Sequence, residues 1–289
     1  MRIFCVALMA LATLGCGDGA ESSANADKVF KFSALPDQKL SEQSARFEPV
    51  AKYLSEALGM KVEYVPVTKY SASVQAFKTG DVHAAWFGGL TGVQARLAVE
   101  GAKAIAQGDA DPNYFSYFIA HKDSGLTGGD NFPEAAKGKK FTFGSESSTS
   151  GRLMPEYFIR ENTGDAPDKF FGAIGFSGTH TNTIAAVNSG SFDVGALSYK
   201  TYDKAAPEEK ANTVVLWKTP FYADYNFTVR GDLDAEFGDG FTAKLTKAFL
   251  AMPGDLCEKS FLRGKMIPAK NSDFDNILAT AEKLGLARK

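Results

Sequence analysis

Two short segments concentrate hydroxyl groups where an expected strand leads into an expected helix. Residues 147–151 read SSTSG, and residues 177–181 read SGTHT. One N-cap hydroxyl satisfies one free N–H of a helix, so four consecutive hydroxyls exceed what capping needs. The surplus hydroxyls, the free first-turn N–H groups and the positive end of the helix dipole together favour an anion. Both segments therefore predict an anion site, and generously capped surface helices are the alternative.

A third segment, residues 87–91 (FGGLT), also follows an expected buried strand. Its paired glycines allow backbone N–H groups to approach a ligand without obstruction, although a tight strand–helix turn explains them equally. In the second segment His180 can donate one ring N–H to an oxyanion while it stays neutral.

Enzymatic chemistry has little support in this sequence. The three histidines, His83, His121 and His180, lack metal-ligand spacing, and Cys257 has no activating motif beside it. No G-x-S-x-G elbow and no P-loop lysine is present. We therefore predict a binding protein that is not an enzyme, has no catalytic residues, and uses neither a cofactor nor a bound metal.

The elements that must position these segments alternate between strand and helix along the whole mature chain. This rhythm predicts an α/β protein with parallel or mixed sheets covered on both faces, in two lobes with a cleft between them. We expect strands at 29–34, 61–67, 81–87, 114–121, 139–143, 172–176, 192–197, 213–218 and 225–230. We expect helices at 44–58, 71–79, 91–100, 151–162, 181–189, 241–251 and 273–284.

Composition excludes several classes of protein. Of 289 residues, 44% are hydrophobic and 23% are charged, which is typical of a globular chain and not of a disordered one. Lys plus Arg total 32 and Asp plus Glu total 34, giving a formal net charge of −2. A near balance of charge argues against nucleic acid as a partner and against a protein that coats anionic membranes.

The first 16 residues read as an export signal. Arg2 precedes an apolar run that is too short to span a bilayer, and the segment ends in Thr13-Leu14-Gly15-Cys16. This ending resembles a bacterial lipobox and predicts lipidation at Cys16, whereas Ala24-Asn25-Ala26 offers a later cleavage pattern for a soluble secreted protein. Residues 17–28 then form a predicted tether, and the mature chain is expected in the periplasm, anchored through its lipid.

On these residues the chain resembles the phosphate/phosphite/phosphonate periplasmic binding proteins of ABC importers. The strongest match is the SSTSG segment, with Pro155 four residues after it and Gly138-Lys139 before it. Supporting matches are residues 123–125 (DSG), 177–180 (SGTH), 193–196 (DVGA) and Lys69-Tyr70. The resemblance implies a two-lobe type II periplasmic binding protein fold that works with permease and ATPase subunits.

The resemblance also implies which residues bind the ligand. The hydroxyl loop would grip an oxyanion, while the histidine, the tyrosine before a helix and the glycine turn would line the cleft. Other features, Trp86 with Phe87-Gly88-Gly89 and Asp224-Tyr225-Asn226, resemble the branch assigned to selenate binding. The expected ligand-binding residues are Ser148, Thr149, Ser150, Gly151, Tyr70, Phe87, Gly88, Gly89, Ser177, Thr179, His180, Thr181, Tyr225 and Asn226.

The expected ligand is a small tetrahedral oxyanion, and its identity stays open at this point. A site with donors alone prefers a dianion such as selenate or sulfate, whereas an inward carboxylate prefers an oxyanion that keeps a proton, such as phosphate or phosphite. Asp224 would decide between them if it faces the ligand, and the sequence does not show whether it does. The alternatives are uptake of a phosphonate or other organic anion, and a sensory module of a signalling system. We expect a monomer with residues 29–113 and 225–289 in one lobe and 114–224 in the other.

Overall fold

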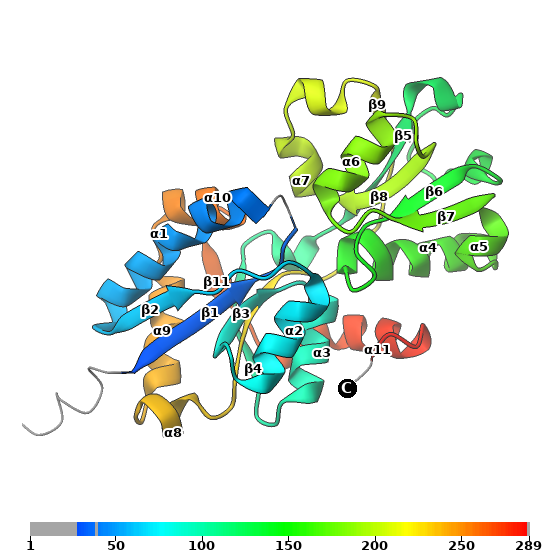
Figure 1. Ribbon diagram of the computed structural model, residues 1–289. Helices are drawn as coiled ribbons and strands as arrows, with labels where there is room; N and C mark the ends of the chain where they lie inside the picture. The colour runs from blue at the N-terminus through cyan, green and yellow to red at the C-terminus, as the bar shows by residue number, and fades with distance from the viewer. Residues whose placement is uncertain (1–27, 38–39, 288–289) are drawn as a thin grey trace, which may run out of the picture.

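The computed structural model describes residues 28–37 and 40–287, and its helices and strands form two lobes (Figure 1). The predicted leader, Cys16 and all but the last residue of the predicted tether lie outside these residues. Among the described residues, no helix is both long and apolar enough to cross a bilayer.

The first lobe is built on a mixed six-stranded sheet with the strand order β11-β4-β10-β3-β1-β2. Strand β1 is parallel to β2 and β3, while β10 runs antiparallel to β3 and β4. The strands are β1 (Val29–Ala34), β2 (Lys61–Tyr64), β3 (Ala84–Phe87), β4 (Lys103–Gly108), β10 (Asn226–Val229) and β11 (Met266–Pro268).

Helices cover both faces of this sheet, as expected for strands whose residues are mostly buried. On one face lie α1 (Leu40–Leu58), α9 (Phe241–Leu250) and α10 (Gly254–Phe261), with α8 (Leu233–Phe237) beside α9. On the other lie α2 (Tyr70–Thr79), α3 (Gly89–Ala98) and α11 (Asp275–Lys283), and Figure 1 shows α11 reaching beneath the second lobe.

The second lobe contains a five-stranded sheet with the order β7-β6-β8-β5-β9. Its strands are β5 (Ser116–His121), β6 (Lys140–Phe143), β7 (Ala173–Phe176), β8 (Val194–Ser198) and β9 (Thr213–Lys218). Its helices are α4 (Met154–Thr163), α5 (Pro167–Phe170), α6 (His180–Asn188) and α7 (Tyr199–Lys204), and a π-helical turn, Thr149–Leu153, precedes α4.

The α/β class and the two-lobe fold are confirmed, and most predicted elements are present within a few residues. Strands 29–34 and 213–218 agree with β1 and β9 at every residue. Strands β4 and β11 and helices α5, α7, α8 and α10 were not among the predicted ranges. The sequence of β4 (KAIAQG) carries one β-branched residue, so it lacks the composition that marks a strand.

The chain crosses between the lobes twice, after β4 and after β9, and the two crossing segments pair with each other. Tyr114 and Tyr222 exchange both backbone hydrogen bonds, each at 2.9 Å. Beside this pair, the Arg263 guanidinium binds the Asp111 carboxylate, and neither side chain is more than 2% exposed. The Arg263 guanidinium also lies over the Tyr114 ring, 5.0 Å from its centroid.

We predict that Arg263→Met destabilises the protein by ~3–5 kcal/mol, because it leaves the Asp111 charge buried without its partner. Chemical denaturation of the ligand-free protein measures this change. The matched control is Lys259→Met, since Lys259 pairs with Asp255 at 3.7 Å but both side chains are more than 70% exposed. Equal unfolding midpoints for the two variants would contradict the role of the buried pair.

Candidate oxyanion-binding site

The SSTSG segment folds into the π-helical turn and buries its hydroxyl groups. The Ser148 Oγ caps this turn by accepting the Gly151 N–H at 2.9 Å, and the Ser148 hydroxyl proton stays available to a further acceptor. Ser148, Thr149 and Ser150 are each at most 2% exposed. The N–H groups of Thr149 and Ser150 lie in the first turn, where the helix itself provides no carbonyl to accept them. This turn therefore presents backbone and side-chain donors into the protein interior.

His180 lies beside this turn as the first residue of α6. Its Nδ1 accepts the Ser198 N–H at 3.4 Å, which places the ring proton on Nε2, 3.5 Å from the Ser150 Oγ. Burial lowers the pKa of His180 to about 4, so the ring is neutral at physiological pH. The backbone N–H of His180 also donates to the Asp37 carbonyl in the other lobe, at 3.3 Å.

The glycine segment contributes the N-terminus of α3, and groups from elsewhere in the chain occupy its first N–H groups. Gly89 N–H donates to the Asp224 Oδ1 at 2.9 Å, and Leu90 N–H donates across the lobes to the Thr149 Oγ1 at 3.0 Å. Glycine at position 88 favours this approach, because a Cβ there would lie 3.0 Å from the Thr149 Oγ1 and 3.1 Å from the Asp224 Oδ1, closer than ordinary van der Waals contact. We expected the glycine N–H groups to face the ligand directly, and instead they hold Asp224 and Thr149.

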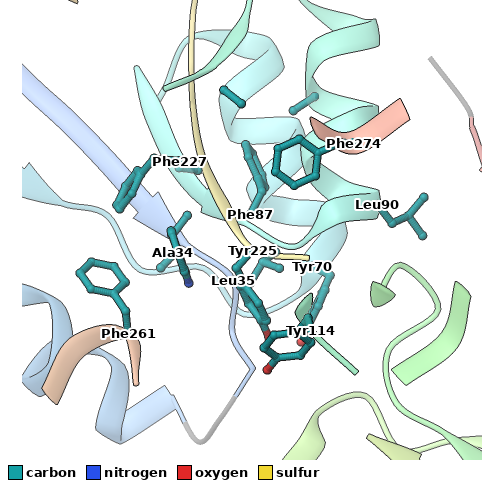
Figure 2. Close-up of a cluster of buried hydrophobic side chains, with 14 of the residues drawn as sticks. Ala34, Leu35, Tyr70, Phe87, Leu90, Tyr114, Tyr225, Phe227, Phe261 and Phe274 are labelled. Carbon is teal, nitrogen blue, oxygen red and sulfur yellow. The ribbon is translucent and has the colours of Figure 1, made fainter. Parts of the chain in front are cut away.

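Two buried polar atoms at this junction have no hydrogen-bond partner among the described residues. They are the Asp224 Oδ2 and the Tyr70 hydroxyl, which belong to side chains 1% and 3% exposed respectively. Figure 2 shows the rings of Tyr70, Tyr114 and Tyr225 gathered here beside Leu35. An unpaired buried polar group costs free energy, so these two atoms point to a missing partner.

The junction therefore combines several donors with one acceptor. The donors are the hydroxyls and N–H groups of the π-helical turn, the Tyr70 hydroxyl and a neutral imidazole, while the acceptor is the Asp224 carboxylate. Burial raises the pKa of Asp224 to about 7, against the opposing effects of the Gly89 N–H and the Thr149 hydroxyl. No group of carboxylate, cysteine or histidine side chains within residues 28–37 and 40–287 is arranged to hold a metal ion.

A family model described as "ABC transporter, phosphonate, periplasmic substrate-binding protein" matches residues 32–274. The chain belongs to this family. As a member, it is the substrate-binding component of an ABC importer of the phosphonate/phosphite type, and this family binds its solute without transforming it.

Relatives of this periplasmic substrate-binding protein support the assignment. A probable ABC transporter phosphite-binding protein, PhnD1 of Prochlorococcus marinus (strain MIT 9301), is 41% identical over 274 residues, which cover 90% of this chain and 91% of the relative. The 1.52 Å resolution structure of that organism's PhnD1 in complex with methylphosphonate superimposes with a TM-score of 0.85 at 40% identity, over 90% of this chain and 99% of the other. A phosphate-import protein of Mycolicibacterium smegmatis is 26% identical, over 97% and 94% of the two chains.

These findings support the predicted family, and they give no support to the selenate branch. The named relatives are a phosphite-binding protein, a methylphosphonate complex and a phosphate-import protein.

Several predicted site residues lie away from this junction or have their polar groups occupied locally. Ser177 Oγ bonds to the Phe143 carbonyl and to Thr183, and Thr179 caps α6 with Thr181 beside it. The Phe87 ring packs edge-on against Phe77 in the core.

Asn226 and Tyr225, both expected to bind the ligand, lie in different places. Asn226 lies beneath α3, where its Oδ1 accepts from Arg96 at 3.0 Å and from Thr228 at 2.7 Å. The Tyr225 ring does reach the junction, where it stacks on Trp86 and meets Tyr114 edge-on at 5.6 Å.

Sequence analysis missed the residues that surround the site from the crossing segments. The Tyr114 hydroxyl bonds to the Ser198 Oγ, and the Ser116 Oγ bonds to the Ser150 carbonyl. Both come from strand-like sequence with no motif around them. A cation near the turn is also unavailable to a ligand, because Arg152 pairs with Glu156 and lies over the Phe143 ring.

The two buried titratable groups predict opposite effects of pH on the ligand-free protein. An unfolded Asp has a pKa of ~3.9, so the native state binds more protons than the unfolded state between about pH 4 and 7. Asp224 therefore makes stability fall as pH rises through that range, by up to ~4 kcal/mol in total. His180 acts in the other direction between about pH 4 and 6.5, because its native pKa is lowered.

We predict that Asp224→Asn removes the Asp224 contribution and leaves that of His180. The free energy of unfolding of wild type minus that of the variant should fall as pH rises from about 4 to 7 and stay constant at higher pH. Urea denaturation at several pH values measures this difference. Parallel profiles for the two proteins would show that Asp224 does not titrate in this range.

Proposed function

We propose that this protein captures phosphite or a small alkylphosphonate such as methylphosphonate, in a singly protonated form, for delivery to an ABC permease and its ATPase. The observation that carries the proposal is the unpartnered Oδ2 of Asp224, an acceptor facing a site otherwise made of donors. Such an acceptor matches an oxyanion that still carries a proton. Sulfate and selenate carry none at neutral pH.

The donor set accounts for the negative charge of this ligand. We propose that Ser148, Thr149 and Ser150 bind the oxyanion from one lobe, with the His180 Nε2 behind Ser150, whereas the Gly151 N–H, which sequence analysis assigned to the ligand, donates to the Ser148 Oγ. From the other lobe, Tyr70 supplies its unpartnered hydroxyl. Hydrogen bonds to a charged group contribute ~1.5–3 kcal/mol each, so a few of them account for micromolar binding, which corresponds to about −8.2 kcal/mol.

The enclosure of the site limits the size of the ligand. The side chains of Ser148, Tyr70, His180 and Asp224 are each at most 3% exposed, and the rings of Tyr114 and Tyr225 lie beside them. A hydrogen or methyl substituent on phosphorus suits such an apolar boundary better than a charged amine tail does.

We also propose that ligand release follows a hinge motion about the two crossing segments, with residues 29–113 and 225–289 moving against residues 114–224. The Leu90–Thr149 bond and the His180–Asp37 bond both join the lobes, so opening must break them. The mature chain is proposed to be a monomer anchored through Cys16, which lies outside the described residues.

A panel of anions tests the proposed ligand. At about pH 8, where Asp224 is largely ionised, phosphite and methylphosphonate should bind most tightly by isothermal calorimetry, while sulfate and selenate bind at least ~10-fold more weakly. Phosphate and 2-aminoethylphosphonate complete the panel. In Asp224→Asn the amide donates where the carboxylate accepts, so the ratio of phosphite affinity to sulfate affinity should fall by ~10–100-fold. An unchanged ratio would contradict contact between Asp224 and the ligand.

Separate variants distinguish the two hydroxyl segments. Thr149→Ala removes the acceptor of the Leu90 N–H and the hydroxyl beside Asp224, and we predict a loss of phosphite affinity of ~10-fold or more. Thr181→Ala is the matched control, because the Thr181 hydroxyl bonds only to Thr179 at 3.1 Å among the described residues. Equal losses in the two variants would move the site toward the N-terminus of α6.

A further inference from the structure

The carbonyl of Ser150 lacks a partner inside its own helix. In the π-helical turn, the Ser148 and Thr149 carbonyls accept the N–H groups of Leu153 and Met154, five residues further on. The corresponding partner of Ser150 is Pro155, which has no N–H. A buried carbonyl without a donor is costly, so this position needs a donor from elsewhere in the chain.

Ser116, the first residue of β5 at the end of the first crossing segment, supplies that donor. Its Oγ lies 2.7 Å from the Ser150 carbonyl oxygen and 2.6 Å from the Tyr222 hydroxyl. Because a carbonyl can only accept, the Ser116 proton goes to Ser150, and Tyr222 must donate its own proton to Ser116. The direction of both hydrogen bonds is therefore determined. Both side chains are buried, at 0% and 7% exposure.

This bond determines the orientation of the peptide group between Ser150 and Gly151. The peptide is planar, so its N–H points opposite to its carbonyl. With the carbonyl held by Ser116, the Gly151 N–H is directed to the Ser148 Oγ, at 2.9 Å. That bond in turn uses a lone pair of Ser148 and leaves its hydroxyl proton free for a ligand.

We propose that Ser116 is a positioning residue for oxyanion binding: its hydroxyl replaces the N–H that Pro155 lacks, and Tyr222, from the second crossing segment, orients it. The proposal rests on the proposed function of the Ser148–Gly151 turn. It assigns the two crossing segments a role in holding the donor array as well as in joining the lobes. Ser116 acts through Ser150, and all oxyanions depend on the same turn, so its loss should weaken them by the same factor.

The test compares Ser116→Ala with Ser33→Ala. Ser33 is also 0% exposed and donates its Oγ proton to a backbone carbonyl, that of Val65, at 2.7 Å, but it lies in the first sheet. Both variants should lower the unfolding midpoint. Only Ser116→Ala should weaken phosphite and sulfate, each by ~10-fold, with their ratio unchanged. Ser116→Thr, which keeps the hydroxyl, should bind both anions as wild type does.

A double-mutant cycle provides the sharpest test, because Pro155→Ala restores an N–H to the turn. Ser116→Ala should cost less affinity in the Pro155→Ala background than in wild type, since the new N–H can take over the Ser150 carbonyl. Tyr222→Phe gives a second variant, which removes the hydroxyl that orients Ser116 and also interacts with the Ser150 side chain, and it should weaken both anions by the same factor.

The outcomes separate this proposal from the proposed function. If wild type and Ser116→Ala bind phosphite equally tightly, the role of Ser116 is overturned and the proposed function is not. Equal costs of Ser116→Ala in the two backgrounds overturn the link to Pro155. If wild type binds none of the anions, both the proposed function and the role of Ser116 are overturned.

Discussion

The carboxylate of Asp224 is buried between two helix N-termini that come from different lobes. Gly89 N–H holds one of its oxygens, and Thr149 lies beside it while accepting the N–H of Leu90. Helix N-termini favour negative charge, so this location offsets part of the cost of burying a carboxylate. The remaining cost appears as a pKa raised to about 7 and as an oxygen without a partner. In the proposed function, that oxygen makes the junction sensitive to the protonation state of the ligand.

The surrounding architecture serves to bring distant segments to this one point. Gly88 and Gly89, at the start of α3, have no side chains, so Thr149 and Asp224 can approach their backbone. The crossing segments pair through Tyr114 and Tyr222, and their hydroxyls reach Ser198 and Ser116. The same segments that join the lobes thus contact the groups that hold the anion turn. In the proposed hinge motion, this geometry links closure of the lobes to the arrangement of the donors.

Local signals in the sequence predicted the fold class and the anion turn. The hydrophobic periodicity of the sequence predicted the alternating strands and helices, and four consecutive hydroxyls before a helix exceed what capping needs. The role of Asp224 was left open, because sequence does not tell whether a side chain faces a ligand. Non-local contacts explain what sequence missed: Ser116 and Tyr114 meet the site only through the pairing of strands far apart in the chain. Asn226 was expected at the ligand for the same reason, whereas its side chain bonds to Arg96 and Thr228 beneath α3.

The number of protons that accompany phosphite binding tests the central claim most directly. At about pH 8 free phosphite is largely a dianion and Asp224 is largely ionised, so a complex in which they share one proton must take that proton from solution. Calorimetry in two buffers of different ionisation enthalpy gives this number. The account predicts uptake of about one proton by wild type and none by Asp224→Asn. Tight binding by wild type with no proton uptake, or equal uptake by the two proteins, would contradict it.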